Sequence, residues 1–148
     1  MTIELTSTAF SEGATIPQQH TGDGADTSPP LRWTDPPPNT KSFALICDDP
    51  DAPRGTWVHW VLFNLPADLR ELKEGGEPKG STPGTNNFGN LGYGGPAPPK
   101  GNPHRYYFKL YALDRRLDLP AGTTKAQLED AMKGHILAEG QLMGKYQR

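Results

Sequence analysis

The apolar residues of the chain fall into short runs that alternate with turns rich in proline and glycine. Runs of β-branched and aromatic side chains bounded by such turns are typical of β-strands. The two strongest runs are residues 57–63 and 104–113, which we expect to be the central strands of a sheet. Weaker runs predict further strands at residues 2–10, 31–33 and 42–47.

Side-chain alternation within the two central strands places one histidine in each beside apolar neighbours. The predicted face of the first strand contains Trp57, His59, Val61 and Phe63. The predicted face of the second contains His104, Tyr106, Phe108 and Leu110. A histidine on an apolar face is either a core residue with one satisfied hydrogen bond or part of a pocket, and the pattern alone leaves both readings open.

Near the C-terminus the apolar spacing changes to three and four residues, which predicts helix. Thr123 or Thr124 can cap the first turn, since Gln127 stands three residues beyond Thr124 in the capping-box position. The spacing predicts two short helices, broken near Gly140 or continuous with a weak point there. We expect a structural role for His135 within the apolar stripe. The stripe consists of Leu128, Met132, His135, Ile136, Leu142, Met143 and Tyr146.

The composition indicates a turn-rich β protein. The 148 residues include 17 glycines and 16 prolines, more than a helical bundle tolerates, and we expect residues 1–148 to form a single, mainly β domain. The formal net charge is −2 with acids and bases interspersed, which argues against a nucleic-acid partner. No apolar run approaches the roughly 20 residues that span a bilayer, so we expect no integral membrane association.

Cysteine usage and the N-terminus indicate a cytoplasmic protein. Cys47 is the single cysteine, so no internal disulfide can form, and residues 1–5 lack the features of a signal peptide. The carboxylates of Asp48 and Asp49 are expected to raise the pKa of the Cys47 thiol, which disfavours it as a nucleophile. We expect Cys47 to be a small buried residue.

Two loops are candidates for a binding site. Residues 48–53 form an acidic turn that its prolines keep out of a helix, and the turn leads directly into the strand of His59. Residues 73–95 form a long, glycine-rich loop whose backbone N–H groups could bind an anion. For the second loop, a plain surface hairpin is the alternative.

Common catalytic motifs are absent from the sequence, including the G-x-S-x-G elbow, the phosphate-binding P-loop, C-x-x-C and H-E-x-x-H. A metal site from His59, His104, Asp49 and Asp51 is chemically feasible, but we expect neither a metal nor a cofactor. An anion pocket explains more of the pattern. In it the histidines donate to a phosphate, while an aspartate orients one of them or binds an ammonium or hydroxyl group of the ligand.

Four motifs follow one another along the chain. They are S-P-P-L-R-W at 28–33, D-P-D-A-P at 49–53, W-V-H at 57–59, and G-P-A-P-P-K-G followed by H-R-Y at 95–106. Together they resemble the phosphatidylethanolamine-binding protein family, also called the Raf kinase inhibitor protein family, in its bacterial and archaeal branch. The resemblance implies a sandwich of two antiparallel β-sheets with one or two short C-terminal helices, and a small anion pocket at one edge.

The resemblance also implies the residues of that pocket. Only residues 54–56 separate Pro53 from Trp57, where mammalian relatives have a longer insertion, so kinase inhibition transfers less well than the pocket chemistry. The implied ligand-binding residues are Asp49, His59, Pro98, Pro99, His104 and Tyr106. The implied pocket-shaping residues are Asp51, Pro53, Trp57 and Gly95.

Three functions stay open at this point. The first is non-enzymatic, regulatory binding of phosphate-bearing small molecules or phospholipid headgroups. The second is inhibition of a kinase or protease, and the third is a small-molecule lyase or cyclase that uses the Asp–His group for acid–base catalysis. The resemblance further implies a homodimer.

Overall fold

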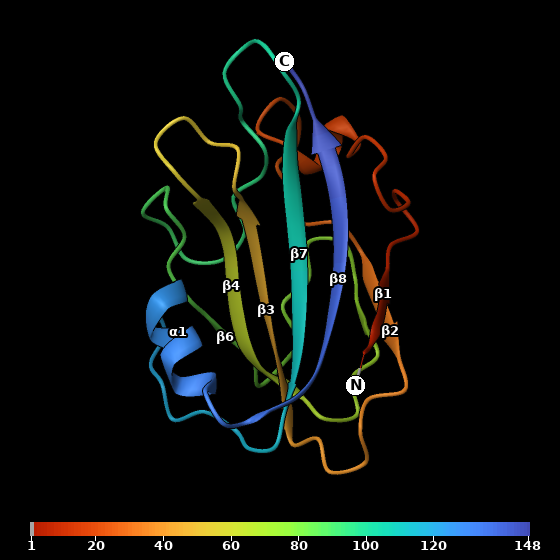
Figure 1. The fold of residues 1–148 in the computed structure, drawn as a ribbon, viewed down its shortest axis with the longest axis vertical. Coiled ribbons are helices and arrows are strands. Elements are labelled where there is room, and N and C mark those ends of the chain that lie inside the picture. The colour runs from red at the N-terminus through yellow and green to blue at the C-terminus, as the bar shows by residue number, and fades with distance from the viewer. Residues whose placement is uncertain (1) are drawn as a thin grey trace.

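The computed structural model describes residues 2–148 and contains two antiparallel β-sheets and one α-helix (Figure 1). The larger sheet has the strand order β6–β4–β3–β7–β8, and the smaller has β1–β2–β5. The fold is thus the predicted mainly β sandwich. Its strands are β1 Glu4–Thr6, β2 Leu31–Thr34, β3 Ser42–Asp49, β4 Trp57–Pro66, β5 Glu71–Leu72, β6 Thr82–Pro83, β7 His104–Leu113 and β8 Ile136–Tyr146, and its helix is α1 Lys125–Met132.

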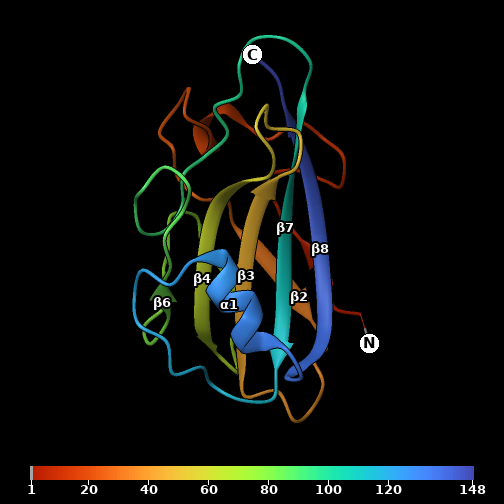
Figure 2. The ribbon, with the colours of Figure 1, turned by 60° about the vertical axis from the view of Figure 1, so that its left-hand side comes forward.

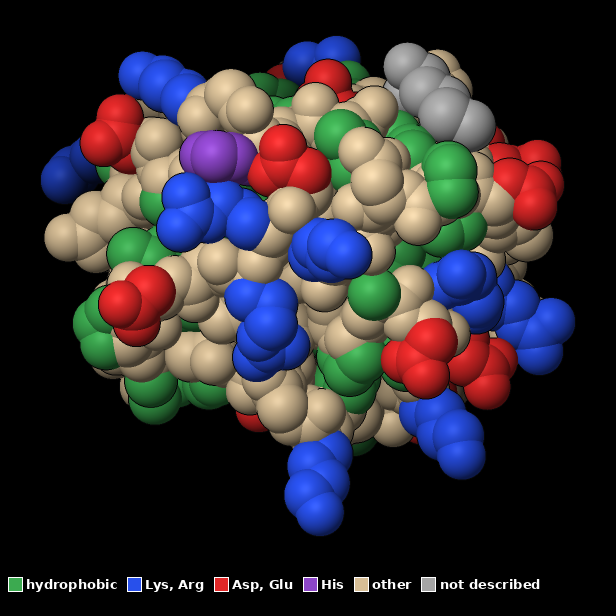
Figure 3. Space-filling model, turned by 90° about the horizontal axis from the view of Figure 1, so that it is seen from below, with side chains coloured by type: hydrophobic (Ala, Val, Ile, Leu, Met, Phe, Trp, Pro, Cys, Tyr) green, Lys and Arg blue, Asp and Glu red, His purple; other side chains and the backbone are tan. Residues whose placement is uncertain are grey.

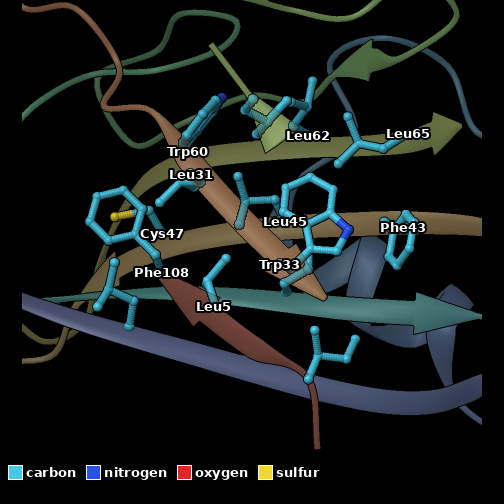
Figure 4. Close-up of a cluster of buried hydrophobic side chains, with 14 of the residues drawn as sticks. Leu5, Leu31, Trp33, Phe43, Leu45, Cys47, Trp60, Leu62, Leu65 and Phe108 are labelled. Carbon is cyan, nitrogen blue, oxygen red and sulfur yellow. The ribbon is translucent and has the colours of Figure 1, made fainter. Parts of the chain in front are cut away.

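The main core lies between the two sheets (Figure 4). Strands β3 and β7 contribute Phe43, Leu45 and Phe108 to it, and the smaller sheet contributes Leu5 and Trp33. All five side chains are buried, because the apolar faces of the two sheets pack against each other.

A second core covers the opposite face of the larger sheet. There α1 packs over β3 and β4 (Figure 2). Leu128 and Met132, one helical turn apart on α1, are fully buried against residues such as Ile46 and Val61. Of the part of the chain that the structure describes, no helix is long and apolar enough to cross a membrane.

The helix begins where the sequence predicted. Thr124 is its N-cap, with its side chain accepting from the backbone of Gln127 while the Gln127 side chain accepts from the backbone of Thr124. This reciprocal pair is the predicted capping box, which satisfies two backbone donors that a helix start leaves open.

The predicted second helix is wrong, because residues 136–146 form strand β8 along the edge of the larger sheet. Ala138, Gly140, Leu142 and Gly144 alternate as its buried positions. Two of these four are glycine, so the strand has no visible apolar alternation in the sequence. Of the predicted stripe, Leu128 and Met132 do lie on the helix, whereas Leu142 and Met143 lie on opposite faces of the strand.

Strand β4 holds one more residue than β3 near its start. Cys47 and Asp48 are consecutive in β3, but their partners in β4 are Trp60 and Val58. His59 therefore has no partner and forms a β-bulge, a feature that is common beside functional sites because it redirects a side chain.

The bulge changes the predicted face of β4. The ring of His59 contacts the ring of Tyr106, whose side chain belongs to the core between the sheets. Val61 and Phe63 belong instead to the core beneath α1. The predicted grouping of His59 with these two residues is wrong, because strict alternation fails where an extra residue is inserted.

The antiparallel order brings three strand ends together. Strand β3 ends at Asp49, β4 begins at Trp57 and β7 begins at His104, all at the upper end in Figure 1. The opposite end, viewed in Figure 3, carries Lys and Arg side chains interspersed with Asp and Glu. The two sequence motifs that contain the histidines therefore meet at one end of the sandwich.

Candidate functional site

A cavity of about 220 Å³ opens at the end where these strands meet. All of the sequence-predicted site residues except Asp51 and Gly95 line it, together with three residues that sequence reasoning did not name. Their roles in binding stay predictions. The lining residues are Asp49, Ala52, Pro53, Trp57, His59, Phe88, Ala97, Pro98, Pro99, His104 and Tyr106.

His104 is held by a buried carboxylate. Its Nδ1 atom lies 2.7 Å from Oδ2 of Asp49, and the two residues are 8% and 3% exposed. The second carboxylate oxygen, Oδ1, accepts the backbone N–H of Asp51 at 2.7 Å. Because an ionised carboxylate only accepts, Nδ1 of His104 is the donor and Nε2 is left for the cavity.

His59 is held by the backbone instead. Its Nδ1 atom donates to the carbonyl oxygen of Gly94 at 2.6 Å, so the neutral ring carries its proton on Nδ1. Burial lowers the pKa of His59 below its ordinary value, although the Gly94 hydrogen bond and the charge of Asp49 oppose that shift. The ring is therefore neutral at neutral pH and presents an Nε2 lone pair.

Tyr106 contributes a phenol with no protein partner. Its ring meets that of His59 edge to face at a centroid distance of 5.1 Å, and its hydroxyl is buried without a hydrogen bond to any of residues 2–148. Burial, with a smaller contribution from the charge of Asp49, raises the pKa of Tyr106 well above its ordinary value. The hydroxyl therefore stays protonated and can donate to a ligand.

The rim of the cavity is aromatic on one side. The ring of Phe88 packs edge to face against Trp57 and His59 at 5.5 and 5.4 Å. Trp57 and Phe88 are 38% and 43% exposed. Sequence reasoning missed Phe88 because it examined the surrounding loop only for its glycine amides.

Those glycine amides are not available to an anion. The N–H groups of Gly89, Gly92, Gly94 and Gly95 donate to other groups of the protein. The Asn86 side chain further organises the loop by accepting from two of its backbone amides. The predicted contribution of these glycines as anion donors is therefore wrong, and the loop supplies the ring of Phe88 and the carbonyl of Gly94 instead.

The two remaining predicted residues lie outside the cavity. Asp51 forms a two-pronged ion pair with Arg105 at 2.9 and 2.8 Å, and this guanidinium lowers the pKa of Asp51 to about 2. It lines a neighbouring cavity of about 550 Å³ with Lys100 and Lys145. Gly95 does not line the cavity, and its N–H donates to the side chain of Asp26 in another loop.

Cys47 is fully buried next to the site. Burial raises the pKa of its thiol well above the ordinary value, and the charges of Asp48 and Asp49 add to the effect. The predicted direction is right, with burial as the larger cause. Within residues 2–148, no three His, Cys, Asp or Glu side chains are grouped in a way that could hold a metal ion.

Sequence comparison identifies related proteins over nearly the full length. The family model for phosphatidylethanolamine-binding proteins matches residues 6–147. A UPF0098 protein of Methanothermobacter thermautotrophicus is 50% identical over 99% of both chains. A UPF0098 protein of Aquifex aeolicus is 47% identical over 99% of this chain and 89% of its own.

Solved structures show the same fold. CT736 of Chlamydia trachomatis, a phosphatidylethanolamine-binding protein homologue, aligns with a TM-score of 0.94 and 43% identity over 99% of this chain and 98% of its own. YbcL of E. coli, described as a member of the mammalian family, aligns with a TM-score of 0.93 and 32% identity over 100% and 99% of the two chains.

Proposed function

The chain belongs to the phosphatidylethanolamine-binding protein family, and we propose that it binds a phosphate-bearing small molecule or phospholipid headgroup between His59 and His104. One observation carries the proposal. Both imidazoles line one small cavity with their Nδ1 atoms already committed, and Tyr106, whose buried hydroxyl has no partner within residues 2–148, lines it too. Three residues whose side chains can donate to an anion, the two histidines when their rings are protonated, thus line one cavity.

The protonation state of the rings decides what they can do. A neutral ring with its proton on Nδ1 offers an acceptor at Nε2, whereas a protonated ring donates there as well. Phosphate monoesters exchange their second proton near pH 6, so a monoanion can bring the shared proton itself. Binding therefore takes up a proton on either the ring or the ligand, and affinity rises as the pH falls.

The volume favours a small ligand. At about 220 Å³ the cavity is smaller than the roughly 300–1,000 Å³ of typical small-molecule sites. It suits a phosphate with a short substituent, while a longer chain would extend past the rim of Trp57 and Phe88. Asp49 has both carboxylate oxygens in use, which supports the orienting role over recognition of a ligand ammonium group.

Calorimetric titration of phosphoethanolamine and of inorganic phosphate tests the proposal, at about one pH unit above and below 6.5. We expect tighter binding at the lower pH and loss of binding in His59→Ala and His104→Ala. His135→Ala is the matched control, since His135 lies outside the cavity. Unchanged affinity in both cavity variants would rule out this function.

A second candidate function is binding of a protein partner, such as a kinase or protease. The exposed side chains of Trp57 and Phe88 favour it, because aromatic side chains at a cavity rim are typical anchors of protein interfaces. The test is affinity capture with the wild type and with Trp57→Ala, where a stable partner should be lost from the variant. A lyase or cyclase has no support beyond the Asp–His pair, and the cytoplasmic location and homodimer stay predictions.

A further inference from the structure

A single peptide group connects His59 to a carboxylate outside the cavity. The carbonyl oxygen of Gly94 accepts from Nδ1 of His59 at 2.6 Å. The next N–H, that of Gly95, donates to Oδ1 of Asp26 at 2.7 Å. Because this carbonyl and this N–H belong to one planar group, the carboxylate and the ring hold opposite ends of the same peptide. We propose that Asp26 is a positioning residue that sets the proton arrangement of His59.

The peptide needs such an anchor because glycine flanks it on both sides. A Cβ at position 94 would lie 2.5 Å from Cδ2 of Phe88. A Cβ at position 95 would collide with the carbonyl of His20 and with the Asp26 carboxylate. Close packing therefore demands glycine, and a peptide between two glycines rotates more easily than any other. Some other contact must fix its orientation.

The two orientations of this peptide give His59 different tautomers. With the carbonyl toward the ring, Nδ1 donates and Nε2 presents a lone pair to the cavity. With the N–H toward the ring, Nδ1 would accept and Nε2 would carry the proton. An ionised carboxylate can only accept, so Asp26 favours the orientation in which the N–H of Gly95 points away from the ring.

The loop that contains Asp26 is itself fixed to the pocket wall. The N–H of Gly22 donates to the carbonyl of Pro96 at 2.8 Å, and the hydroxyl of Tyr93 donates to the carbonyl of His20 at 2.5 Å. Asp26 adopts a positive φ of 59°, a conformation that aspartate tolerates better than most residues. These contacts hold the carboxylate in place against the Gly94–Gly95 peptide.

The contribution of Asp26 is geometric more than electrostatic. The residue is exposed, so solvent screens its charge at the ring. Asp49, Tyr106 and His104 share the cavity with His59, and the carboxylate of Asp48, which is paired with two lysines, adds a further charge effect on the ring. None of these four changes in the variants below.

The test measures the His59 tautomer in the ligand-free protein from its ring ¹⁵N chemical shifts, about one pH unit above 6.5. Asp26→Gly removes the acceptor and tolerates the positive φ. Asp26→Asn keeps the size but adds an NH₂ donor, so it can satisfy either peptide orientation. We expect the Nε2–H tautomer to increase most in Asp26→Gly and less in Asp26→Asn. Asp23→Asn, in the same loop but paired with Arg148, is the control and should match the wild type.

The pH dependence of inorganic phosphate binding provides a second readout, and this part rests on the proposed function. In Asp26→Gly the neutral ring already donates through Nε2, so affinity should rise less on acidification than in the wild type. An unchanged tautomer ratio in Asp26→Gly, with strand amides at wild-type positions, overturns the positioning role. If the tautomer responds but no protein binds phosphate, the proposed function fails and the positioning role stands.

Discussion

The Nδ1 atom of His104 lies 2.7 Å from the Oδ2 atom of Asp49, and both side chains are buried at the edge of the cavity. The protein contains a second such pair in a more exposed position, since Nδ1 of His135 lies 2.9 Å from Oδ1 of Asp114 with both side chains about one-third exposed. Comparing these two His–Asp pairs shows how burial changes the role of the same hydrogen bond. In the cavity the pair fixes the ring of His104, whereas the His135–Asp114 pair joins the segments on either side of α1.

Asp49→Asn should weaken phosphate binding by about 10-fold or more, equal to at least about 1.5 kcal/mol for a hydrogen bond to a charged group. The amide oxygen can still accept from His104, but it cannot compensate the charge of a protonated ring. Calorimetry below pH 6.5 measures the change. Asp114→Asn is the matched control, and equal losses in the two variants would contradict a specific role for Asp49.

The stability of the protein should depend on the protonation of His59. Burial lowers its pKa in the folded state, so the unfolded chain binds the proton more readily. The stability that the neutral ring contributes is therefore complete above about pH 6.5 and is lost as the pH falls from there to the folded-state pKa. Urea unfolding at several pH values measures this slope.

The comparison variant for that slope is His59→Gln, which keeps a polar side chain but does not titrate in this range. Its free energy of unfolding should fall less steeply than that of the wild type as the pH is lowered below 6.5. Parallel curves for the two proteins would show that another group causes the acid destabilisation.

Most of the sheet could be predicted from the sequence, because β3, β4 and β7 have strong apolar patterns bounded by turns. The histidines could be assigned to one pocket from their motifs, since each stands near a strand end beside a proline-rich turn. Local sequence patterns are enough to predict a side chain's position where its neighbours belong to the same strand and the adjoining turn.

The remaining features depend on contacts between distant segments. The bulge at His59 is visible only in its pairing with β3. Asp26 reaches the pocket across 69 positions of sequence, in a loop whose composition shows only turn formers. The sequence pattern predicts helix in place of strand β8, because the inward glycines that make room for the N-terminal segment leave no apolar alternation.

Gly140→Ala tests the account of β8. An added Cβ would meet the backbone of Ile3, whose N–H donates to the carbonyl of Glu139 at 2.8 Å. Overpacking of this kind should destabilise the fold by about 1–3 kcal/mol, measured as the free energy of unfolding in urea. Gln141→Ala, at the neighbouring exposed position, should change it by about 0.5 kcal/mol or less. A neutral Gly140→Ala would mean that the N-terminal segment is not closely packed there.

Tyr106→Phe should separate stability from binding. The hydroxyl is buried and has no hydrogen bond within residues 2–148. Its burial therefore costs desolvation free energy that no hydrogen bond offsets in the unliganded protein. Its removal should leave the unfolding free energy unchanged or raise it by about 1 kcal/mol, the lower end of the penalty for an unsatisfied buried group. The ring stays, and with it the edge-to-face contact to His59. Phosphate affinity should fall by about 5- to 10-fold, because a ligand oxygen loses a donor worth about 1 kcal/mol.

Unfolding free energy and phosphate affinity of Tyr106→Phe should be measured on the same preparation, since we expect the first to stay the same or rise and the second to fall. If Tyr106 served packing alone, the substitution would lower the free energy of unfolding and leave phosphate affinity unchanged. A hydroxyl that binds a ligand gives the reverse, because its removal takes away an unsatisfied buried group in the free protein and a donor in the complex. Trp60 offers the comparison, since its buried indole N–H also has no partner in the described chain but lies outside the cavity. Trp60→Phe should therefore destabilise the protein through lost packing while phosphate affinity stays at the wild-type value.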